Sequence, residues 1–409
     1  MKAKCLNFAA NYKVLKYDIA IIGAGIVGLS TAFKIKEKDP NKRIIIIDKE
    51  EGPAAHQTGH NSGVIHSGLY YKPGSLKATN CIRGYHMLID FCNQYEVDYE
   101  LCGKLVVATS EEEKPLLKNL YERGQQNGLD GLKMLKGAEI KEYEPHVHGV
   151  EGFFVPQTGI IDYSVVSAKL AEVLSTQDVS LAYNHLVKDI NVKTDKVEII
   201  TDKETIEASQ MINCAGLYSD KIAKMSGDNP GVLIIPFRGE YYKLKEDKEH
   251  LVKNLIYPVP DPNFPFLGVH FTRMKKGGVE AGPNAVFAFR REGYKKSDIN
   301  IAETLEALAW PGFQKVAAKY WKTGMGEYYR SFSKTAFTKA LQKLIPEIQK
   351  EDLTTGGSGV RAQACDRHGG LIDDFIIHET KRTINVLNAP SPAATSALSI
   401  GQTLAKLVE

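Results

Sequence analysis

The segment 17–48 constrains the fold of this 409-residue chain more than any other part of it. The apolar run Ile19–Ile22 is typical of a strand buried on both faces, and the glycine-rich turn Gly23–Gly28 follows it directly. A helix is predicted over Leu29–Lys38, and Ile44–Ile47 supplies the next strand. Strand, glycine turn, helix and strand in this order predict a Rossmann-like dinucleotide-binding unit in an α/β protein.

The residues of this turn have separate predicted roles. Gly23 permits the tight turn, Gly25 lets the backbone approach a pyrophosphate, and Gly28 lets the helix pack against the strand. The N–H groups of the first helical turn, beginning near Ile26, face the phosphate, where the helix dipole favours negative charge. Asp48 stands 20 residues after Gly28, where a carboxylate accepts hydrogen bonds from ribose hydroxyls.

The composition is that of an ordinary globular protein, with 43% hydrophobic and 25% charged residues, and the length predicts about two or three domains. A net charge of +3 is too small to indicate a nucleic-acid partner. The sequence has no apolar run of roughly 18 residues that would span a membrane. Six scattered cysteines without zinc or dithiol spacing, and a lysine-containing start without an apolar signal segment, predict a cytoplasmic protein.

Two further segments resemble parts of a cofactor site. Met211–Ser219 is an apolar strand that ends in Ala215-Gly216, and Gly356–Arg361 precedes a strand and the run Asn388–Ser396, where Ala393 and its small neighbours enter a helix. The cofactor segments thus lie at the start, middle and end of the chain. This distribution favours FAD over NAD, because a flavin needs a ring cradle as well as a phosphate loop.

The stretch 57–71 offers such a cradle just after Asp48. Thr58, Asn61, Ser62 and Gly63 combine small residues with hydrogen-bonding groups. The alternative interpretation is a polar surface loop.

The segment 233–294 differs in character, because its apolar and polar residues alternate as in antiparallel strands with one covered face. The sequence therefore predicts a mixed α/β fold in which a Rossmann-like FAD-binding domain is interleaved with an antiparallel-sheet substrate domain. The predicted boundaries are 17–85, 150–230 and 350–409 for the FAD-binding domain, and 86–149 and 231–349 for the substrate domain.

With these residues in view, the chain resembles the L-2-hydroxyglutarate dehydrogenase family of the D-amino-acid oxidase-like flavoproteins. Two departures, Arg273-Met274-Lys275-Lys276 and Cys365, lie beside the family motifs and concern local loop shape. The motifs that carry the resemblance are His56–Gly68, Cys102–Leu105, Thr158–Tyr163, Cys214–Asp220, Pro236–Tyr241, Phe264–Thr272, Gly282–Val286, Gly359–Ala364 and Asn388–Thr395.

The resemblance implies oxidation of L-2-hydroxyglutarate to 2-oxoglutarate by hydride transfer from C2 to flavin N5, with electrons passed to a quinone or oxygen. In this family context Arg361 is the candidate for the C1 carboxylate, because guanidinium binds carboxylates bidentately. Arg238 is a candidate for the second carboxylate, with a salt bridge to Glu240 as the alternative. Lys104 is a third candidate cation.

Histidine suits proton abstraction from the C2 hydroxyl, because its usual pKa is near neutrality. His66 and His270 are equal candidates for this base, whereas His60 is expected to position flavin or backbone. The pair His146 and His148 lies in a loop without a third ligand nearby, so no metal site is predicted.

Two other functions remain open at this point. A flavin-dependent amino-acid or amine oxidase would share the glycine turn but would not need two substrate cations. A non-catalytic flavin- or nucleotide-binding module would share the cofactor site alone.

Trp310 and Trp321 fall in the lysine-containing aromatic stretch 305–321. This composition suits a membrane–water interface, so peripheral contact with the inner face of a membrane is one hypothesis. The alternative is a core-packing helix broken at Pro311.

Overall fold

The computed structural model describes residues 15–261 and 268–409. The predictions that involve Cys5, the first fourteen residues and the Phe264–Leu267 part of one motif lie outside this range.

The first large sheet contains the predicted dinucleotide unit. β1 (Leu15–Ile22) lies between β2 (Ile44–Ile47) and β12 (Thr205–Asn213) and is parallel to both. The remaining strands of this sheet are β9 (Val179–Ala182), β10 (Val187–Val192), β11 (Val197–Thr201), β18 (Ile376–Glu379) and β19 (Thr383–Asn388).

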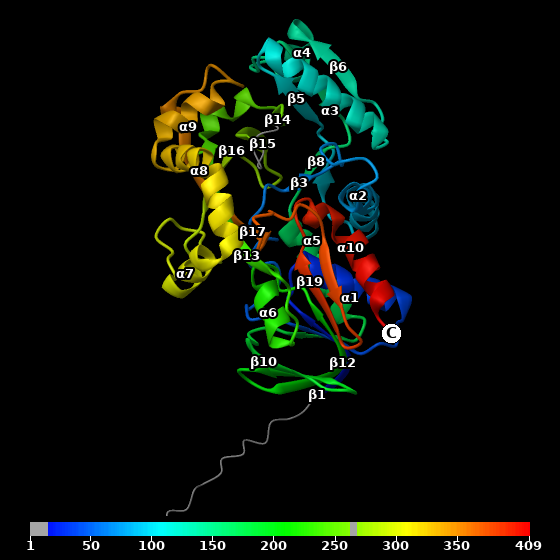
Figure 1. The fold of residues 1–409 in the computed structure, drawn as a ribbon. Coiled ribbons are helices and arrows are strands. Elements are labelled where there is room, and N and C mark those ends of the chain that lie inside the picture. The colour runs from blue at the N-terminus through cyan, green and yellow to red at the C-terminus, as the bar shows by residue number, and fades with distance from the viewer. Residues whose placement is uncertain (1–14, 262–267) are drawn as a thin grey trace, which may run out of the picture.

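Both faces of this sheet are covered, which explains its isoleucine-rich strands. Ile19 and Ile21 pack against a layer of helices, whereas Ala20 and Ile22 face the antiparallel ribbon of β10–β12. Because neither face meets water, all four residues of β2 are buried, as the apolar run predicted. The helical layer, visible in Figure 1, consists of α1 (Ile26–Lys38), α2 (Leu76–Gln94), α5 (Tyr163–Ser175) and α10 (Ala393–Leu407), with α6 (Ser219–Met225) on the ribbon side.

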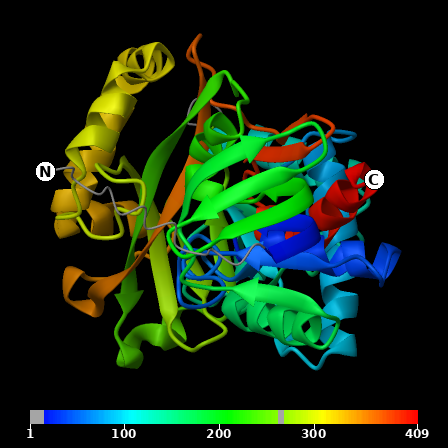
Figure 2. The same ribbon diagram turned by 90° about the horizontal axis from the view of Figure 1, so that it is seen from below.

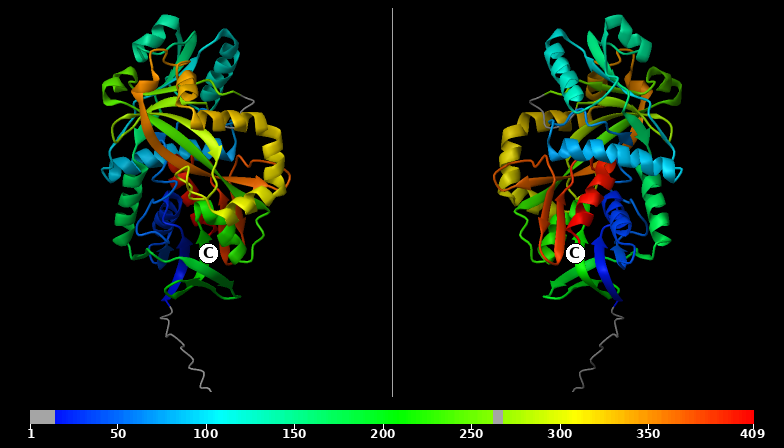
Figure 3. Two further views of the ribbon diagram at one scale, coloured as in Figure 1. Left: turned by 90° about the vertical axis from the view of Figure 1, so that its left-hand side faces the viewer. Right: turned by 90° about the vertical axis from the view of Figure 1, so that its right-hand side faces the viewer.

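The second large sheet is mostly antiparallel, as the alternation in 233–294 predicted. Its longest pair of strands, β13 (Val232–Leu244) and β17 (Leu353–Asp366), sweeps past the first sheet and is seen edge-on in Figure 3. The other strands, in order from β13, are β16 (Val279–Phe287), β15 (His270–Arg273), β14 (Leu255–Pro258), β5 (Lys104–Ala108), β7 (Glu151–Val155) and β6 (Lys133–Lys136).

Helices and short elements complete the second sheet and its link to the first. A small sheet of β3 (Val64–Ile65), β8 (Gly159–Ile161) and β4 (Tyr99–Glu100) joins the cradle segment to the substrate side. The helices are α3 (Lys114–Gln126), α4 (Gly137–Tyr143), α7 (Ile301–Ala309), α8 (Pro311–Phe332) and α9 (Lys334–Leu341), and the 3-10 helices are η1 (Glu111–Glu113), η2 (Gly216–Tyr218), η3 (Glu246–Leu251) and η4 (Lys350–Asp352).

The two sheets confirm the predicted architecture of a Rossmann-like part interleaved with an antiparallel part. Two strands, however, fall on the other side of the predicted boundaries: β7 and β17 hydrogen-bond within the second sheet, although the ranges 150–230 and 350–409 assigned them to the cofactor domain. Strand partners are not visible in sequence patterns, which explains the difference. We propose that the domain boundaries lie after Val155 and after Asp366.

The tryptophan-containing segment forms two helices at the outer side of the second sheet, seen from below in Figure 2. They are separated at Trp310, in keeping with the predicted break at Pro311. The indole of Trp310 donates to the carbonyls of Cys365 and Asp366, at 3.0 and 3.1 Å, and packs on the sheet. Trp321, in contrast, is 59% exposed, so the two tryptophans have different environments. Among the helices that the structure describes, none has the length and apolar composition needed to cross a membrane.

Candidate active site

A cavity of about 900 Å³ is lined by residues from both large sheets. Its lining includes the glycine turn and Asp48, and it also includes His66, His270 and Arg361, which are electrostatic neighbours and mark what we call the inner end. Almost all predicted cofactor residues line it, namely Gly23, Gly25, Ile26, Asp48, Thr58, Asn61, Ser62, Ala215, Gly216 and Ala393.

The glycine turn is too tight for side chains at two of its positions. Gly23 has a φ of +111°, and a Cβ there would lie 2.4 Å from the carbonyl oxygen of Cys214. A Cβ at Gly28 would lie 2.0 Å from the carbonyl oxygen of Gly23, so Gly28 supports the turn by packing and does not line the cavity. Gly25 faces the cavity and leaves its backbone accessible, as predicted.

Asp48 does more than the sequence suggested. Its Oδ2 accepts a hydrogen bond from the backbone N–H of Ala24 at 2.6 Å, and its Oδ1 accepts one from Glu50 at 2.9 Å. The carboxylate therefore anchors the glycine turn and still lines the cavity, where its remaining lone pairs can accept hydrogen bonds from a ribose.

Two helix N-termini meet the cavity, and the backbone N–H of Ile26 in the first of them donates to Oγ1 of Thr58 at 3.1 Å. α1 begins after Gly25 and α10 after Pro392, and neither residue caps its helix. Uncapped N–H groups bind anions such as a pyrophosphate. Together with the glycine turn and Asp48, these termini fit a bound dinucleotide, and the elongated cavity leads on to the cradle segment that would hold a flavin ring.

The cradle segment faces two cavities. Thr58, His60 and Asn61 line the large cavity and also a smaller neighbouring one, whereas Gly63 lines only the smaller one. His60 stacks on the ring of Tyr294, with centroids 4.3 Å apart, and its Nδ1 lies 3.0 Å from the carbonyl oxygen of His56. These contacts hold His60 in place, and its role in positioning flavin or backbone stays a prediction.

At the inner end of the cavity, His270 is held in one orientation. Its Nδ1 lies 2.8 Å from the carbonyl oxygen of Gly268, so that nitrogen carries the proton and Nε2 keeps its lone pair. The ring also stacks on Tyr257, with centroids 3.9 Å apart. Burial lowers the pKa of His270 to about 4, so the imidazole is neutral at pH 7 and able to accept a proton.

His66 is the other candidate base and lines the same end of the cavity. Burial, followed by the positive charges of Lys104 and other neighbours, lowers its pKa to about 3. No side-chain hydrogen bond orients the ring of His66 within the described part of the chain. The two histidines, which the sequence could not rank, thus differ among the residues that the structure describes: a hydrogen bond orients the ring of His270 but not that of His66.

Lys104 is a buried cation without a counter-charge. It is 1% exposed, and its ammonium lies 4.4 Å from the ring centre of Tyr70 and 5.0 Å from that of Tyr257, two rings that line the cavity. Burial lowers its pKa to about 7. Among residues 15–261 and 268–409 no carboxylate pairs with Lys104, which is unusual because buried charges are normally paired.

Arg238 was a candidate ligand for the second substrate carboxylate, but its side chain has other partners. Its Nε and one terminal nitrogen donate to Glu240 at 3.0 and 2.8 Å, and the other terminal nitrogen donates to the carbonyls of Gly293 and Lys295. It does not line the large cavity. The structure thus favours the alternative of a strand salt bridge. Lys104 does not line the cavity either, but it contacts the rings of Tyr70 and Tyr257, which do, and it is therefore the second candidate cation.

A second group of charges lies near Asp48, at the opposite end of the cavity. Lys49 and His56 pair with Glu292 at 2.7 and 3.0 Å and also with Glu50. Burial alone would lower the pKa of His56, but its hydrogen bond to Glu292 raises that pKa instead. Glu50, His56 and Glu292 lie close enough to hold a metal ion, but the ammonium of Lys49 already provides the positive charge there.

Sequence reasoning missed several tyrosines at the inner end: Tyr70, Tyr71, Tyr241 and Tyr257 line the cavity. Tyr241 lies inside a motif and Tyr70 and Tyr71 follow one, whereas Tyr257 lies between motifs, and aromatic residues in strands and loops usually indicate packing. Only the fold shows that these four rings face one space.

Comparison with known proteins bears on the chemistry of this cavity. Residues 18–407 match the family of FAD dependent oxidoreductases (DAO). The L-2-hydroxyglutarate dehydrogenase of Indibacter alkaliphilus is 60% identical over 391 residues, which cover 95% of this chain and 98% of that protein. That of Escherichia coli K12 is 45% identical over 96% of this chain and 93% of its own length, and the human mitochondrial protein is 43% identical over 96% and 89%.

Two solved structures show the same fold. The L-alpha-glycerophosphate oxidase of Mycoplasma pneumoniae, with FAD bound, has a TM-score of 0.78 at 22% identity and covers 96% of this chain and 94% of its own. The glycine oxidase of Geobacillus kaustophilus has a TM-score of 0.73 at 16% identity, over 96% and 95%.

Proposed function

Because this chain belongs to the family of FAD-dependent oxidoreductases, we propose that it oxidises L-2-hydroxyglutarate to 2-oxoglutarate at the inner end of the large cavity. Three relatives of that name, 43–60% identical, support the substrate. The observation that carries the proposal is Lys104, a buried cation that no carboxylate pairs with among residues 15–261 and 268–409. A dicarboxylic acid supplies the missing charge.

Arg361 binds the C1 carboxylate in this proposal. It lies in β17 where that strand lines the cavity, and burial lowers its pKa. A guanidinium can hold one carboxylate through two parallel hydrogen bonds, which also fixes the plane of the substrate. Lys104 supplies the positive charge for the second carboxylate from behind Tyr70 and Tyr257.

His270 accepts the proton of the C2 hydroxyl at Nε2, because Gly268 already holds its Nδ1. The carboxylates of the bound substrate raise the pKa of this histidine from its low value, since negative charge favours the imidazolium. Bound FAD supplies the capacity to accept the C2 hydrogen as a hydride. His66 lines the same end of the cavity and is proposed to shape the site.

An anaerobic titration of the purified yellow protein tests this proposal. L-2-hydroxyglutarate should bleach the flavin absorbance, whereas the D-enantiomer and amino acids should not. Bleaching by amino acids instead would indicate an amino-acid oxidase, and bleaching by neither class would favour a non-catalytic flavin module.

We further propose a quinone as the physiological electron acceptor, reached by peripheral contact with a membrane. Support comes from the α8 stripe, which we define as Trp321, Met325, Tyr329 and Phe332. These side chains are 59–77% exposed and recur at helical spacing along one side of α8. Large exposed apolar surfaces mark contact sites, and an amphipathic helix that also carries lysines favours an anionic bilayer.

The charges on α8 agree with this choice of partner. Lys315, Lys319 and Lys322 are exposed, whereas Glu327, the acidic residue of this helix, is buried and pairs with Arg330. An anionic surface therefore meets cations and apolar side chains but no exposed carboxylate on this helix.

Sedimentation with vesicles of anionic lipid tests the membrane contact. Met325→Asp with Phe332→Asp should abolish binding, while Val192→Asp, an exposed apolar residue on β10, should not. Loss of self-association in the double variant, without any vesicle binding by the wild type, would instead make the stripe an interface between copies of this chain.

A further inference from the structure

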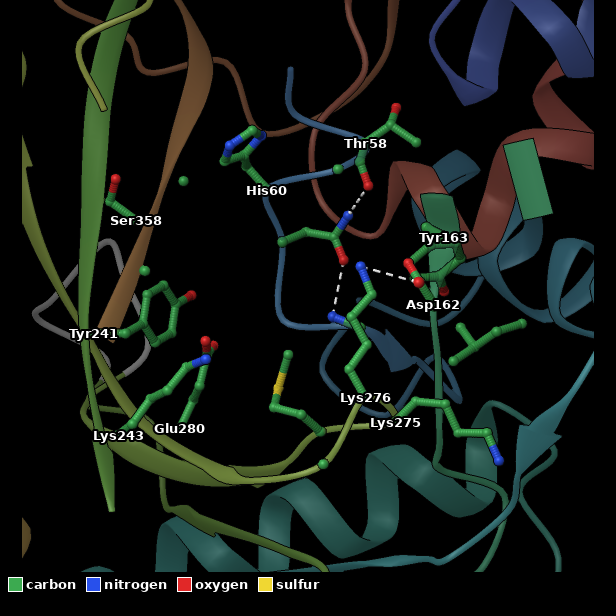
Figure 4. Close-up of a pocket in the computed structure, with 18 residues that line it drawn as sticks. Thr58, His60, Asp162, Tyr163, Tyr241, Lys243, Lys275, Lys276, Glu280 and Ser358 are labelled. Carbon is green, nitrogen blue, oxygen red and sulfur yellow. Dashed lines mark hydrogen bonds and ion pairs between the residues drawn. The ribbon is translucent and has the colours of Figure 1, made fainter. Parts of the chain in front are cut away.

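A second cavity, of about 200 Å³, lies directly behind the cradle segment (Figure 4). It shares a wall with the large cavity, and the residues that face both are Thr58, His60, Asn61, Tyr163, Tyr241 and Gly359. The second cavity therefore touches the same segment that is predicted to hold the flavin ring, but from another side than the proposed substrate site.

Part of the shared wall is formed by backbone, at Gly359 and His60. A Cβ at Gly359 would lie 2.3 Å from the carbonyl oxygen of His60, so β17 and the cradle segment are in direct backbone contact. Gly357, two residues earlier in β17, faces the second cavity alone. A thin wall permits close approach of a second ligand to the cofactor side without passage through the substrate site.

Two of the three lysines that line this cavity are paired with carboxylates, and the third, Lys243, has Glu280 as its charged neighbour. Lys276 pairs with Asp162 at 3.0 Å, and Lys275 pairs with Asp98 at 2.7 Å. In Figure 4, Lys276 and Asp162 lie on one side of the cavity, across from Tyr241, Lys243 and Glu280. A site with paired lysines suits a neutral ligand, in contrast to the basic residues around the proposed substrate site.

Glu280 is the group in this cavity that can exchange a proton. Its Oε1 lies 3.8 Å from the Cβ position of Gly357, and no hydrogen bond or ion pair satisfies its carboxyl group within residues 15–261 and 268–409. Burial raises its pKa, which the charge of Lys243 only partly offsets. The other titratable groups that line this cavity are Tyr241, His60, Tyr163, Asp162, Lys243, Lys275 and Lys276.

We propose that the second cavity binds the ring of the electron acceptor, a quinone, and that Glu280 donates a proton to it. This inference rests on the proposed function and extends it to the second half of the reaction. Oxidation of the alcohol releases two electrons and two protons, and one quinone takes up two electrons and two protons to leave as one hydroquinone. Glu280 provides one of these protons and regains it from solvent.

Binding to the oxidised holoenzyme tests the site without turnover. A water-soluble 1,4-benzoquinone should perturb the flavin spectrum with the same dissociation constant in the presence and absence of saturating glutarate, a dicarboxylate without the reacting hydroxyl. Gly357→Leu should weaken quinone binding at least ten-fold and leave glutarate binding as in the wild type. Gly52→Leu is the matched control, since Gly52 lines neither cavity and an added Cβ there meets no atom within 4 Å.

Competition between glutarate and the quinone, or unchanged quinone binding in Gly357→Leu, would overturn the proposal. FAD content of each variant reports whether it has folded. Because dithionite reduces the cofactor without any organic substrate, reoxidation by the quinone can be followed even if L-2-hydroxyglutarate is not the substrate. A failed substrate assignment is therefore distinguishable from a failed acceptor site.

The role of Glu280 has its own readout. Reoxidation of the dithionite-reduced enzyme by the quinone should slow in the wild type as pH rises and Glu280 loses its proton. Glu280→Gln should be at least ten-fold slower at low pH and lose this dependence, with quinone binding unchanged. An unaltered pH profile in Glu280→Gln would remove Glu280 from the proton path.

Discussion

The two ends of the large cavity contain similar basic residues but differ in how their charge is compensated. At the Asp48 end, Lys49 and His56 pair with Glu50 and Glu292, and the pKa values of both bases are raised despite burial, which alone would lower them. At this end, carboxylates of the protein itself therefore neutralise the positive charges, and no ligand is needed to do so.

At the inner end, the same two residue types have no such partners among the described residues. Burial lowers the pKa of Lys104 to about 7 and that of His270 to about 4, and no carboxylate pairs with either. A buried cation without a counter-ion costs folding free energy, so its persistence indicates a site made for a ligand. The comparison therefore supports the proposal that the substrate binds at the inner end and that the charges at the other end have a structural role.

The largest expected effect separates the two histidines of these ends. His270→Ala should slow anaerobic flavin reduction by L-2-hydroxyglutarate by roughly 10²–10⁴-fold, because it removes the proposed general base. His56→Ala, at the paired end, is the control and should leave this rate within a few-fold. Stopped-flow absorbance measures the rate of flavin reduction in both variants. An equal decrease in rate in the two variants would contradict the claim that only the inner end binds the substrate.

The next effect concerns Arg361. Arg361→Lys keeps the charge but loses the two parallel hydrogen bonds, and disruption of a buried charge pair costs about 2–5 kcal/mol. We expect kcat/KM to fall accordingly while FAD content stays at the wild-type level. Steady-state kinetics with wild-type values would exclude Arg361 from the substrate site.

A pH profile sharpens the comparison further. In the free enzyme Lys104 loses its proton above about pH 7, so kcat/KM for L-2-hydroxyglutarate should fall as pH rises through that value. Lys104→Arg stays charged and should remove this fall. L-2-hydroxybutyrate, which lacks the second carboxylate, should show little dependence on residue 104. A rise of kcat/KM across the same range would mean that neutral Lys104 acts as a base.

The smallest effect belongs to the paired end. Burial alone would raise the pKa of Glu292, but its partners His56 and Lys49 lower it from 4.5 to about 2. The carboxylate therefore contributes stability that is present above pH 4.5 and lost as pH falls towards 2. Glu292→Gln should reduce the free energy of unfolding by about 1 kcal/mol at pH 7, with the difference shrinking in acid. Thermal unfolding at both pH values measures it, and an unchanged Tm at pH 7 would show that the pairing is energetically neutral.

Local sequence rules captured the cofactor side because its geometry is local. The roles of Gly23 and Gly28 follow from turn and packing constraints within a few residues, and the structure has both contacts. The anchoring bond from Asp48 to Ala24 was not predicted, since it depends on how the turn folds back onto the second strand.

The substrate side depends on contacts between distant parts of the chain. Lys104 becomes informative only when Tyr70 and Tyr257 enclose it, and sequence spacing does not show that these three residues meet. Arg238 shows the opposite case. Its motif suggested a substrate ligand, but its guanidinium donates hydrogen bonds to Glu240 on the same face of the strand. The carbonyl of Gly268, which orients the ring of His270 and supports its choice over His66 as the proposed base, is likewise not visible in the sequence.

Proton uptake on binding tests the central claim, that the substrate supplies the negative charge missing at the inner end. At pH 8 Lys104 is largely neutral, and a bound dicarboxylate should raise its pKa, so glutarate binding should take up about one proton. Calorimetry in buffers of different ionisation enthalpy measures this uptake. We predict that it disappears in Lys104→Met; binding without proton uptake, or the same uptake in Lys104→Met, would contradict the account.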